Sequence, residues 1–187
     1  ETLRFCAYHG QVTLTTAEDS LPPDRPNLSK DYLAGTAPEA WVPIRSEKFY
    51  QQQNITLLRN TVVTAIDTKA KWVKTTDGQQ LEYGALLLAT GAEPVHPPIQ
   101  GAQLPHVHYL RSISDSRSII AAIETGAKHF VVIGASFIGL EVAASLRARK
   151  VDVRVVAPEK VPMERVFGSR LGNFVHKLHV SKGVQLN

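Results

Sequence analysis

The pattern of apolar and polar residues changes in character along the chain. Short runs with alternating polarity fill the first half, and period-two alternation predicts half-buried strands. There we expect a helix tail, strands and two short helices, over residues 1–7, 11–16, 29–33, 46–53, 55–58, 62–66 and 71–75. Ser29 and Ser46 can cap the two short helices. In the second half, longer helical stretches alternate with apolar runs. We expect helices and strands over residues 115–124, 130–133, 137–146, 151–156 and 170–180.

Turn residues punctuate the first half and mark where it ends. Asp77-Gly78 lies between alternating runs, which is a strong signal for a hairpin. The run Ala85-Leu-Leu-Leu-Ala89 predicts a buried strand that ends at Thr90-Gly91-Ala92. Three prolines that follow prevent regular structure, namely Pro94, Pro97 and Pro98. They indicate a linker before a second α/β unit.

The stretch from His129 to Leu146 carries the most specific chemical signal. Four apolar residues, 130–133, precede a glycine-bearing turn, and a proline-free helical run follows it. Gly134 and Gly139 occupy the first and third positions of a dinucleotide-binding fingerprint, with Ser136 at the middle position instead of glycine. Backbone N–H groups and the helix dipole at such a turn receive phosphates. The turn residues expected to contact a nucleotide are Gly134, Ser136, Phe137, Ile138 and Gly139. Glycines that serve only strand–helix packing are the alternative.

Composition narrows the class of protein. The 187 residues are 43% hydrophobic, enough for a packed core, and no run approaches the roughly 20 apolar residues of a membrane-spanning helix. A single cysteine, Cys6, excludes an intramolecular disulfide and agrees with a reducing cytosol, so we expect a cytoplasmic protein that does not enter a membrane. The N-terminus lacks the order of a signal peptide.

Charge leaves two interpretations open. The net charge is +4, and four basic residues cluster near the glycine turn, namely Arg147, Arg149, Lys150 and Arg154. They favour an acidic partner by long-range attraction, or they form a solvated helix end that stabilises the helix dipole. Nucleic acid is not the expected partner, because no aromatic platform or reading helix accompanies the charge. His176 and His179 lie three residues apart, but two ligands do not make a zinc site, so we expect no metal.

Several motifs occur together in a specific order over nearly the whole chain. They are Asp24-Arg-Pro-Asn-Leu-Ser-Lys30, Val63-Thr-Ala-Ile-Asp67, Leu86-Leu-Leu-Ala-Thr-Gly-Ala92, Leu110-Arg-Ser112 with Asp115, and the turn from Gly134 with Glu141 and Ala143. With this order the chain resembles the two-dinucleotide-domain flavoprotein reductases, in the branch of ferredoxin, rubredoxin and putidaredoxin reductases and apoptosis-inducing-factor-like proteins. Related thiol enzymes carry a cysteine early in the FAD domain, and 22–33 has none.

The resemblance implies an α/β fold with two Rossmann-like three-layer domains and a small antiparallel β insertion. Residues 1–110 would form an FAD-binding domain that lacks its N-terminal glycine fingerprint, and residues 111–187 an NAD(P)-binding domain that lacks its C-terminal part. Glu1-Thr-Leu-Arg4 would be the end of the helix that follows the missing fingerprint. The chain would then be a fragment, inactive and colourless by itself.

The resemblance also implies roles for individual residues. Lys30 would approach the flavin ring, and Glu141 would lie near nicotinamide and flavin and pair with Lys30 across the domain interface. The remaining expected FAD contacts are Glu18 (ribose), Val63 (adenine, through its backbone), Arg25, Ala89, Thr90, Gly91 and Arg111. A structural interpretation stays open for several of them, with Lys30 and Arg111 as surface cations, Glu18 as a loop acid, Val63 in the core and Glu141 as a solvated helix residue.

The implied reaction is hydride transfer from NAD(P)H to FAD, followed by single-electron transfer to a ferredoxin or Rieske-type iron–sulfur protein. The cofactors carry this chemistry, and the protein aligns them. A non-catalytic, apoptosis-inducing-factor-like redox signalling protein that binds NADH and FAD is the alternative. NADH is the expected nicotinamide. Ala157 stands where an acid would bind the ribose, but Glu159 follows two residues later, while Arg154 would suit a 2′-phosphate.

Overall fold

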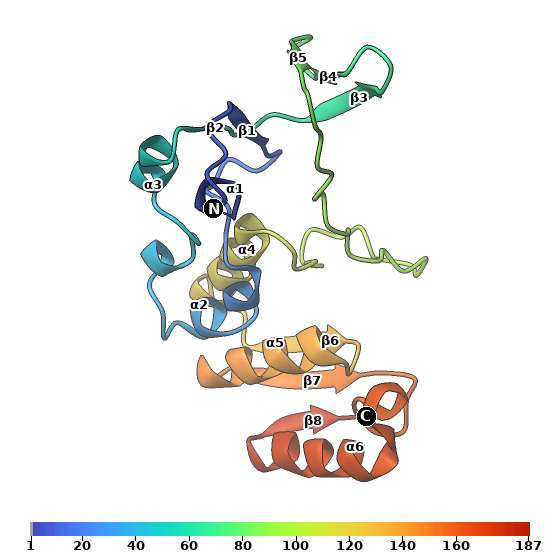
Figure 1. Cartoon of the computed structure of the whole chain (residues 1–187). Helices are drawn as coiled ribbons and strands as arrows, with labels where there is room; N and C mark the ends of the chain where they lie inside the picture. The colour runs from blue at the N-terminus through green and yellow to red at the C-terminus, as the bar shows by residue number, and fades with distance from the viewer. Residues whose placement is uncertain (1) are drawn as a thin grey trace. The chain divides into compact units, whose positions relative to one another are not determined.

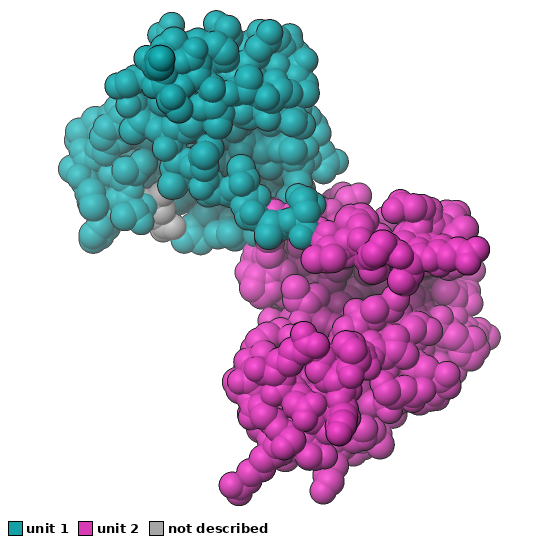
Figure 2. All heavy atoms as spheres, turned by 90° about the vertical axis from the view of Figure 1, so that its right-hand side faces the viewer, with its two compact units in different colours: residues 1–23, 43–93 teal, residues 24–42, 94–187 magenta. Residues whose placement is uncertain are grey.

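The computed structural model describes residues 2–187, so Glu1 of the expected helix tail lies outside the described residues. The chain divides into two compact units, unit 1 with residues 1–23 and 43–93, and unit 2 with residues 24–42 and 94–187 (Figure 2). The predicted division at residue 110 concerns nucleotide binding, which these units do not test, and it stays a prediction.

Unit 1 combines a parallel strand pair with a small antiparallel sheet (Figure 1). Its elements are α1 (Thr2–Phe5), β1 (Val12–Thr15), α3 (Glu47–Gln52), β2 (Ile55–Leu58), β3 (Val63–Asp67), β4 (Trp72–Thr75) and β5 (Gln80–Glu82). β1 pairs with β2 in parallel, with Val12 opposite Ile55. β3, β4 and β5 form the predicted antiparallel insertion, with the Asp-Gly turn between β4 and β5. The predicted cap at Ser46 is also confirmed, since its side chain accepts a hydrogen bond from the Phe49 amide.

The predicted buried strand at 85–89 is wrong. This segment has no regular structure, and the side chains of Leu87 and Leu88 are 86% and 63% exposed. An apolar run becomes a strand only where a neighbouring strand accepts and donates its ladder hydrogen bonds. Neither described sheet of unit 1 includes the segment, so the apolar pattern lacks the pairing that would make it a strand.

Unit 2 is built on a parallel sheet with the strand order β6-β7-β8. Its elements are the 3₁₀ turn η1 (Arg25–Leu28), α2 (Asp31–Ala34), η2 (Glu39–Trp41), α4 (Ile113–Glu124), β6 (His129–Ile133), α5 (Phe137–Ala148), β7 (Asp152–Val156), α6 (Glu164–Ser181) and β8 (Val184–Leu186). The predicted strand–helix–strand order of the glycine turn is confirmed, and with it the α/β fold class. α6 is longer than predicted and contains a non-helical residue, Gly168.

The core of unit 2 lies between the sheet and α5. Buried residues of α5, including Ala143 and Leu146, pack with Val153 and Val155 of β7 and with Leu33 of α2. The opposite side of the sheet is open in the described chain. Val131 and Ile133 of β6 are 64% and 66% exposed. The described residues therefore cover β6 on one face only.

A capping box fixes the start of α4 in unit 2. Ser112 accepts a hydrogen bond from the Asp115 amide, and the Asp115 carboxylate accepts from the amides of Ser112 and Arg111. This capping box begins α4 and fixes the backbone of Arg111. The predicted cap at Ser29 is wrong. α2 begins after Lys30, and the Ser29 hydroxyl lies within hydrogen-bonding distance of the Glu141 carboxylate and the Pro26 carbonyl instead.

Among the described residues, no helix combines the length and apolar character needed to cross a membrane.

Candidate functional site

The glycine turn of unit 2 has the geometry of a nucleotide-binding turn. Gly134 follows β6 with φ of 111°, a conformation that favours glycine. A Cβ built on Gly139 would lie 2.0 Å from the carbonyl oxygen of Gly134, so only glycine lets α5 approach the turn this closely. Beside Gly134 itself, a built Cβ would meet no atom within 4 Å. The turn is thus tightly packed on the helix side and open on the other.

The first residues of α5 are exposed beside this turn. Ser136 is the N-cap in an extended conformation, and its hydroxyl makes no capping hydrogen bond to the helix. Ser136, Phe137 and Ile138 are exposed. The first N–H groups of a helix have no partner within the helix, and together with the dipole they attract phosphate. The residues present therefore fit a pyrophosphate, with serine in place of the middle glycine.

The loop after β7 lies beside this turn. The Met163 amide donates to the carbonyl of Ala135 at 3.0 Å, which ties the loop to the glycine turn. Ala157 directly follows β7 and offers no acid. Glu159 is half-buried, and its Oε1 lies 2.8 Å from Nε of Arg165. The loop thus brings one carboxylate to the edge of the sheet where the turn begins, and this carboxylate pairs with an exposed guanidinium from the start of α6.

Lys30 and Glu141 form an ion pair within unit 2. Lys30 Nζ lies 2.9 Å from Glu141 Oε1, and the Ser29 hydroxyl donates to Glu141 Oε2 at 2.7 Å. The predicted pairing of Lys30 with Glu141 is confirmed, and both residues belong to the same compact unit. Their predicted places near flavin and nicotinamide stay predictions. The pair joins the segment before α2 to the helix that starts at the glycine turn.

A polar row on α5 holds the segment that carries Lys30. Glu141, Ser145 and Arg149 are spaced by four residues, so they share one face of the helix. The buried Ser145 hydroxyl donates to the carbonyls of Ser29 and Lys30 at 2.7 and 3.2 Å. Arg149 donates to the carbonyls of Leu33 and Tyr32. Sequence reasoning missed this row, although its spacing of four on a largely apolar helix is a readable signal.

Three residues of the basic cluster bind neighbouring elements of unit 2. Arg147 and Arg149 lie at the C-terminal end of α5, away from the glycine turn, and both are half-buried. Arg147 donates to the carbonyls of Val151 and Lys182, at 2.5 and 3.3 Å. Arg154 on β7 donates to the side chain of Gln185. A solvated helix end is thus the wrong description for the two helix arginines, because they bind the backbone of neighbouring elements.

Two further predicted FAD contacts meet in unit 2. Arg25 Nη1 donates to the carbonyl of Arg111 at 2.7 Å, which joins η1 to the residue just before the capping box. Lys30, Arg25 and Arg111 therefore belong to one compact unit, although 81 residues separate Lys30 from Arg111 in the sequence.

A second ion pair, between Glu39 and Arg117, holds the C-terminal part of residues 24–42. Arg117 of α4 donates two hydrogen bonds to the Glu39 carboxylate, at 3.1 and 2.5 Å, and the Tyr32 hydroxyl donates to it at 2.6 Å. The Arg117 guanidinium, followed by the Tyr32 hydroxyl, lowers the pKa of Glu39 below its ordinary 4.5. Burial, followed by the nearby carboxylate, raises the pKa of Tyr32 to about 12.

The predicted FAD residues of unit 1 form two groups. Glu18 follows β1, and its carbonyl accepts from the Asn60 amide at 3.1 Å, while the Thr61 amide donates to Thr16. Glu18 therefore lies close to the residues that lead to Val63, beyond the carboxyl ends of the parallel strands, where such sheets bind ligands. The second group, Ala89, Thr90 and Gly91, lies in the exposed irregular segment.

Comparison with known proteins identifies the family. The family model of the pyridine nucleotide-disulphide oxidoreductases matches residues 1–187. The chain belongs to this family. Its relatives include rhodocoxin reductase of Rhodococcus erythropolis, 37% identical over 99% of this chain and 43% of the relative. Another is the ferredoxin--NAD(+) reductase component of the anthranilate 1,2-dioxygenase system of Burkholderia cepacia, 36% identical over 98% of this chain and 45% of the relative.

A solved oxidoreductase of the family has the same fold. The ferredoxin reductase for the CYP199A2 system from Rhodopseudomonas palustris superposes with a TM-score of 0.92 at 36% identity, covering 100% of this chain and 46% of that structure. The chain thus spans less than half the length of these relatives.

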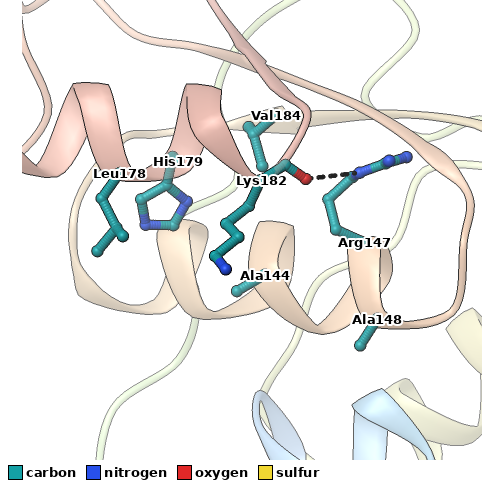
Figure 3. Close-up of a pocket in the computed structure, with 7 residues that line it drawn as sticks. All are labelled: Ala144, Arg147, Ala148, Leu178, His179, Lys182 and Val184. Atoms are coloured by element: carbon teal, nitrogen blue, oxygen red, sulfur yellow. Dashed lines mark hydrogen bonds between the residues drawn. The ribbon is translucent and has the colours of Figure 1, made fainter.

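A pocket of about 440 Å³ lies elsewhere in unit 2, between the last turns of α5 and α6 (Figure 3). It is lined by Ala144, Arg147, Ala148, Leu178, His179, Lys182 and Val184. None of these is a predicted site residue. Burial lowers the pKa of His179. Among the described residues, no three potential ligand side chains cluster as a metal site would require.

Alanine at position 139 tests the close packing of the turn. We expect Gly139→Ala to cost about 2 to 3 kcal/mol of stability, because the new Cβ must displace the backbone of Gly134. Dinucleotide binding should weaken as the turn shifts. Thermal unfolding and NADH titration measure the two effects. Gly84→Ala is the control, since a Cβ there meets no atom within 4 Å. Equal stability of the two variants would contradict the close approach of α5 to the backbone of Gly134.

The Glu39–Arg117 pair predicts a dependence of stability on pH. Because the folded-state pKa of Glu39 is lowered, its contribution is present above pH 4.5 and is lost as the pH falls through the folded-state pKa. The pair is partly exposed, so the loss should be about 1 kcal/mol or less. Thermal unfolding of the chain and of Glu39→Gln between pH 3 and 7 measures it. The two curves should converge at the acidic end. A constant difference across this range would refute the assignment.

Proposed function

We propose that this chain acts within a flavoprotein of the length of its relatives, which passes hydride from NAD(P)H to FAD and then single electrons to a ferredoxin-like iron–sulfur protein. The observation that carries the proposal is the Lys30–Glu141 ion pair, because it links a lysine to the helix that begins at the glycine turn. The family and the names of its relatives support the oxidoreductase class and an iron–sulfur partner.

The residues of the chain would hold and align the two cofactors. The glycine turn with Ser136, Phe137 and Ile138 would bind the pyrophosphate of the nicotinamide dinucleotide through backbone N–H groups. Glu18, Val63 and residues 89–91 would bind the adenosine and phosphates of FAD. The two cofactors, when bound, would supply the hydride and electron chemistry through their nicotinamide and flavin rings.

Lys30 and Glu141 would control charge where the cofactors meet. An ammonium group favours negative charge nearby, so Lys30 would stabilise a reduced anionic ring. Glu141 would orient Lys30, and Arg25 and Arg111 would bind FAD from the same unit. The proposed electron acceptor is a ferredoxin, either of the Rieske type or of another type. A cytoplasmic location is also proposed, from the single cysteine of the chain.

NADH is the proposed nicotinamide substrate. Glu159 lies in the loop tied to the glycine turn, and a carboxylate accepts hydrogen bonds from ribose hydroxyls but repels a 2′-phosphate.

Replacing Lys30 tests the proposed reaction. In the flavin-loaded full-length protein, Lys30→Gln should slow flavin reduction by NADH about tenfold or more, since it removes the charge that favours the reduced ring. Stopped-flow absorbance of the flavin measures the rate. Lys177→Gln on α6 is the matched control. If NADH failed to bleach the flavin of the unaltered protein, the proposed oxidoreductase activity would be refuted.

The acceptor step is tested separately. A protein that bleaches with NADH but reduces no ferredoxin would refute that step. A slow, long-lived complex between reduced flavin and NAD would then support the signalling alternative.

Replacing Glu159 tests the nicotinamide choice. We expect the full-length protein to oxidise NADH faster than NADPH, and Glu159→Gln to reduce the ratio of the two kcat/KM values about tenfold, because the neutral amide no longer repels the 2′-phosphate. Glu164→Gln, another acid of this region, is the control. A preference for NADPH in the unaltered protein would contradict the assignment of Glu159.

A further inference from the structure

The Ser29 side chain is buried directly beside the Lys30–Glu141 ion pair. Ser29 is 5% exposed, and its Oγ lies 2.7 Å from Glu141 Oε2 and 3.3 Å from the carbonyl of Pro26. A serine hydroxyl has one proton to donate. The shorter contact and the charge of the acceptor favour donation to the carboxylate, because hydrogen bonds to charged acceptors are the stronger ones.

Two neighbouring residues therefore hold the two oxygens of one carboxylate. Oε1 of Glu141 faces the Lys30 ammonium at 2.9 Å, and Oε2 accepts from Ser29. The lysine side chain is 48% exposed, and an exposed ion pair by itself barely restrains a flexible lysine stem. With Oε2 bonded to a buried hydroxyl, the carboxylate has a fixed plane and presents Oε1 to Lys30 in one direction.

The backbone around Ser29 is itself fixed. The buried hydroxyl of Ser145 donates to the carbonyls of Ser29 and Lys30 at 2.7 and 3.2 Å. A group whose own supports are rigid can hold another group in one geometry.

We propose that Ser29 is a positioning residue, which orients the Glu141 carboxylate and through it holds the Lys30 ammonium in place. The inference rests on the proposed function of Lys30 beside the flavin. Ser29 contacts Glu141, and its proposed effect on the reaction passes through the ion pair.

The main test is Ser29→Ala in the flavin-loaded full-length protein. Without the hydroxyl, Glu141 loses its fixed orientation and Lys30 its place. The midpoint potential of the bound flavin should become more negative, and its reduction by NADH should slow about tenfold, which corresponds to about 1.4 kcal/mol. Spectroelectrochemistry measures the potential, and stopped-flow absorbance measures the rate.

Three variants separate positioning from a general loss of structure. Ser116→Ala removes a buried hydroxyl of α4 that donates to the carbonyl of Leu28 at 3.1 Å, and it does not touch Lys30 or Glu141. It should lower the thermal midpoint like Ser29→Ala but leave the potential unchanged. Ser29→Thr keeps a hydroxyl and should restore the potential. Ser29→Cys keeps the size with a weaker donor, and it should fall between serine and alanine.

A measurement without any cofactor chemistry completes the design. A double-mutant cycle of Lys30→Gln and Glu141→Gln in thermal unfolding gives the coupling between the two side chains. We expect this coupling to fall at least by half when Ser29→Ala is added. The same cycle with Ser116→Ala should keep its coupling.

The outcomes distinguish this inference from the proposed function. If Lys30→Gln leaves the flavin potential unchanged, the proposed role of Lys30 fails. If Lys30→Gln shifts the potential while Ser29→Ala changes neither potential nor coupling, only the role of Ser29 is overturned. A potential that shifts equally in Ser116→Ala and Ser29→Ala would also overturn it, because the effect would then belong to the segment as a whole.

Discussion

The structure of unit 2 depends on hydrogen bonds that α5 donates to, and accepts from, a segment more than a hundred residues earlier in the sequence. This segment includes α2, and a four-residue helix does not hold its shape alone. Its carbonyls are instead bound by Ser145 and Arg149. Once this contact forms, Leu33 can fill the core, and Lys30 has a defined place relative to the glycine turn.

The same helix serves two purposes at its two ends. Its N-terminus carries the glycine turn, where packing against the strand demands glycine at position 139. Further along, one face is apolar and meets the sheet, and another face is polar and meets residues 28–33. A single rigid helix thus connects the expected phosphate site with the ion pair of Lys30, so both keep a constant separation without any contact between their side chains.

Sequence reasoning succeeded where the signal is local. The apolar run before Gly134, the glycine spacing and the Asp77-Gly78 turn are contained in a few neighbouring residues, and the structure has the predicted elements at each. It failed at 85–89, where an apolar run formed no strand because pairing decides the outcome and pairing is not local. The spacing of Ser145 and Arg149 can be read from the sequence, but their hydrogen-bond partners cannot, because these partners lie more than a hundred residues away. The resemblance to flavoprotein reductases predicted the Lys30–Glu141 pair, but the buried hydroxyl that completes it follows from no periodicity.

The way in which unit 2 is assembled from two separated stretches of chain has a consequence for how the protein acquires its fold. Residues 24–42 leave the ribosome well before their partners on α4 and α5 exist. All of 43–93 must be looped out before the two stretches can meet, and closing a long loop costs entropy that is recovered only when the final contacts form. During synthesis, the apolar side chains that are buried in the folded unit therefore stay exposed, namely Leu28, Leu33 and Val42. Folding of unit 2 is expected to be late and cooperative, and a shortened chain that starts at residue 94 would lack part of its own core.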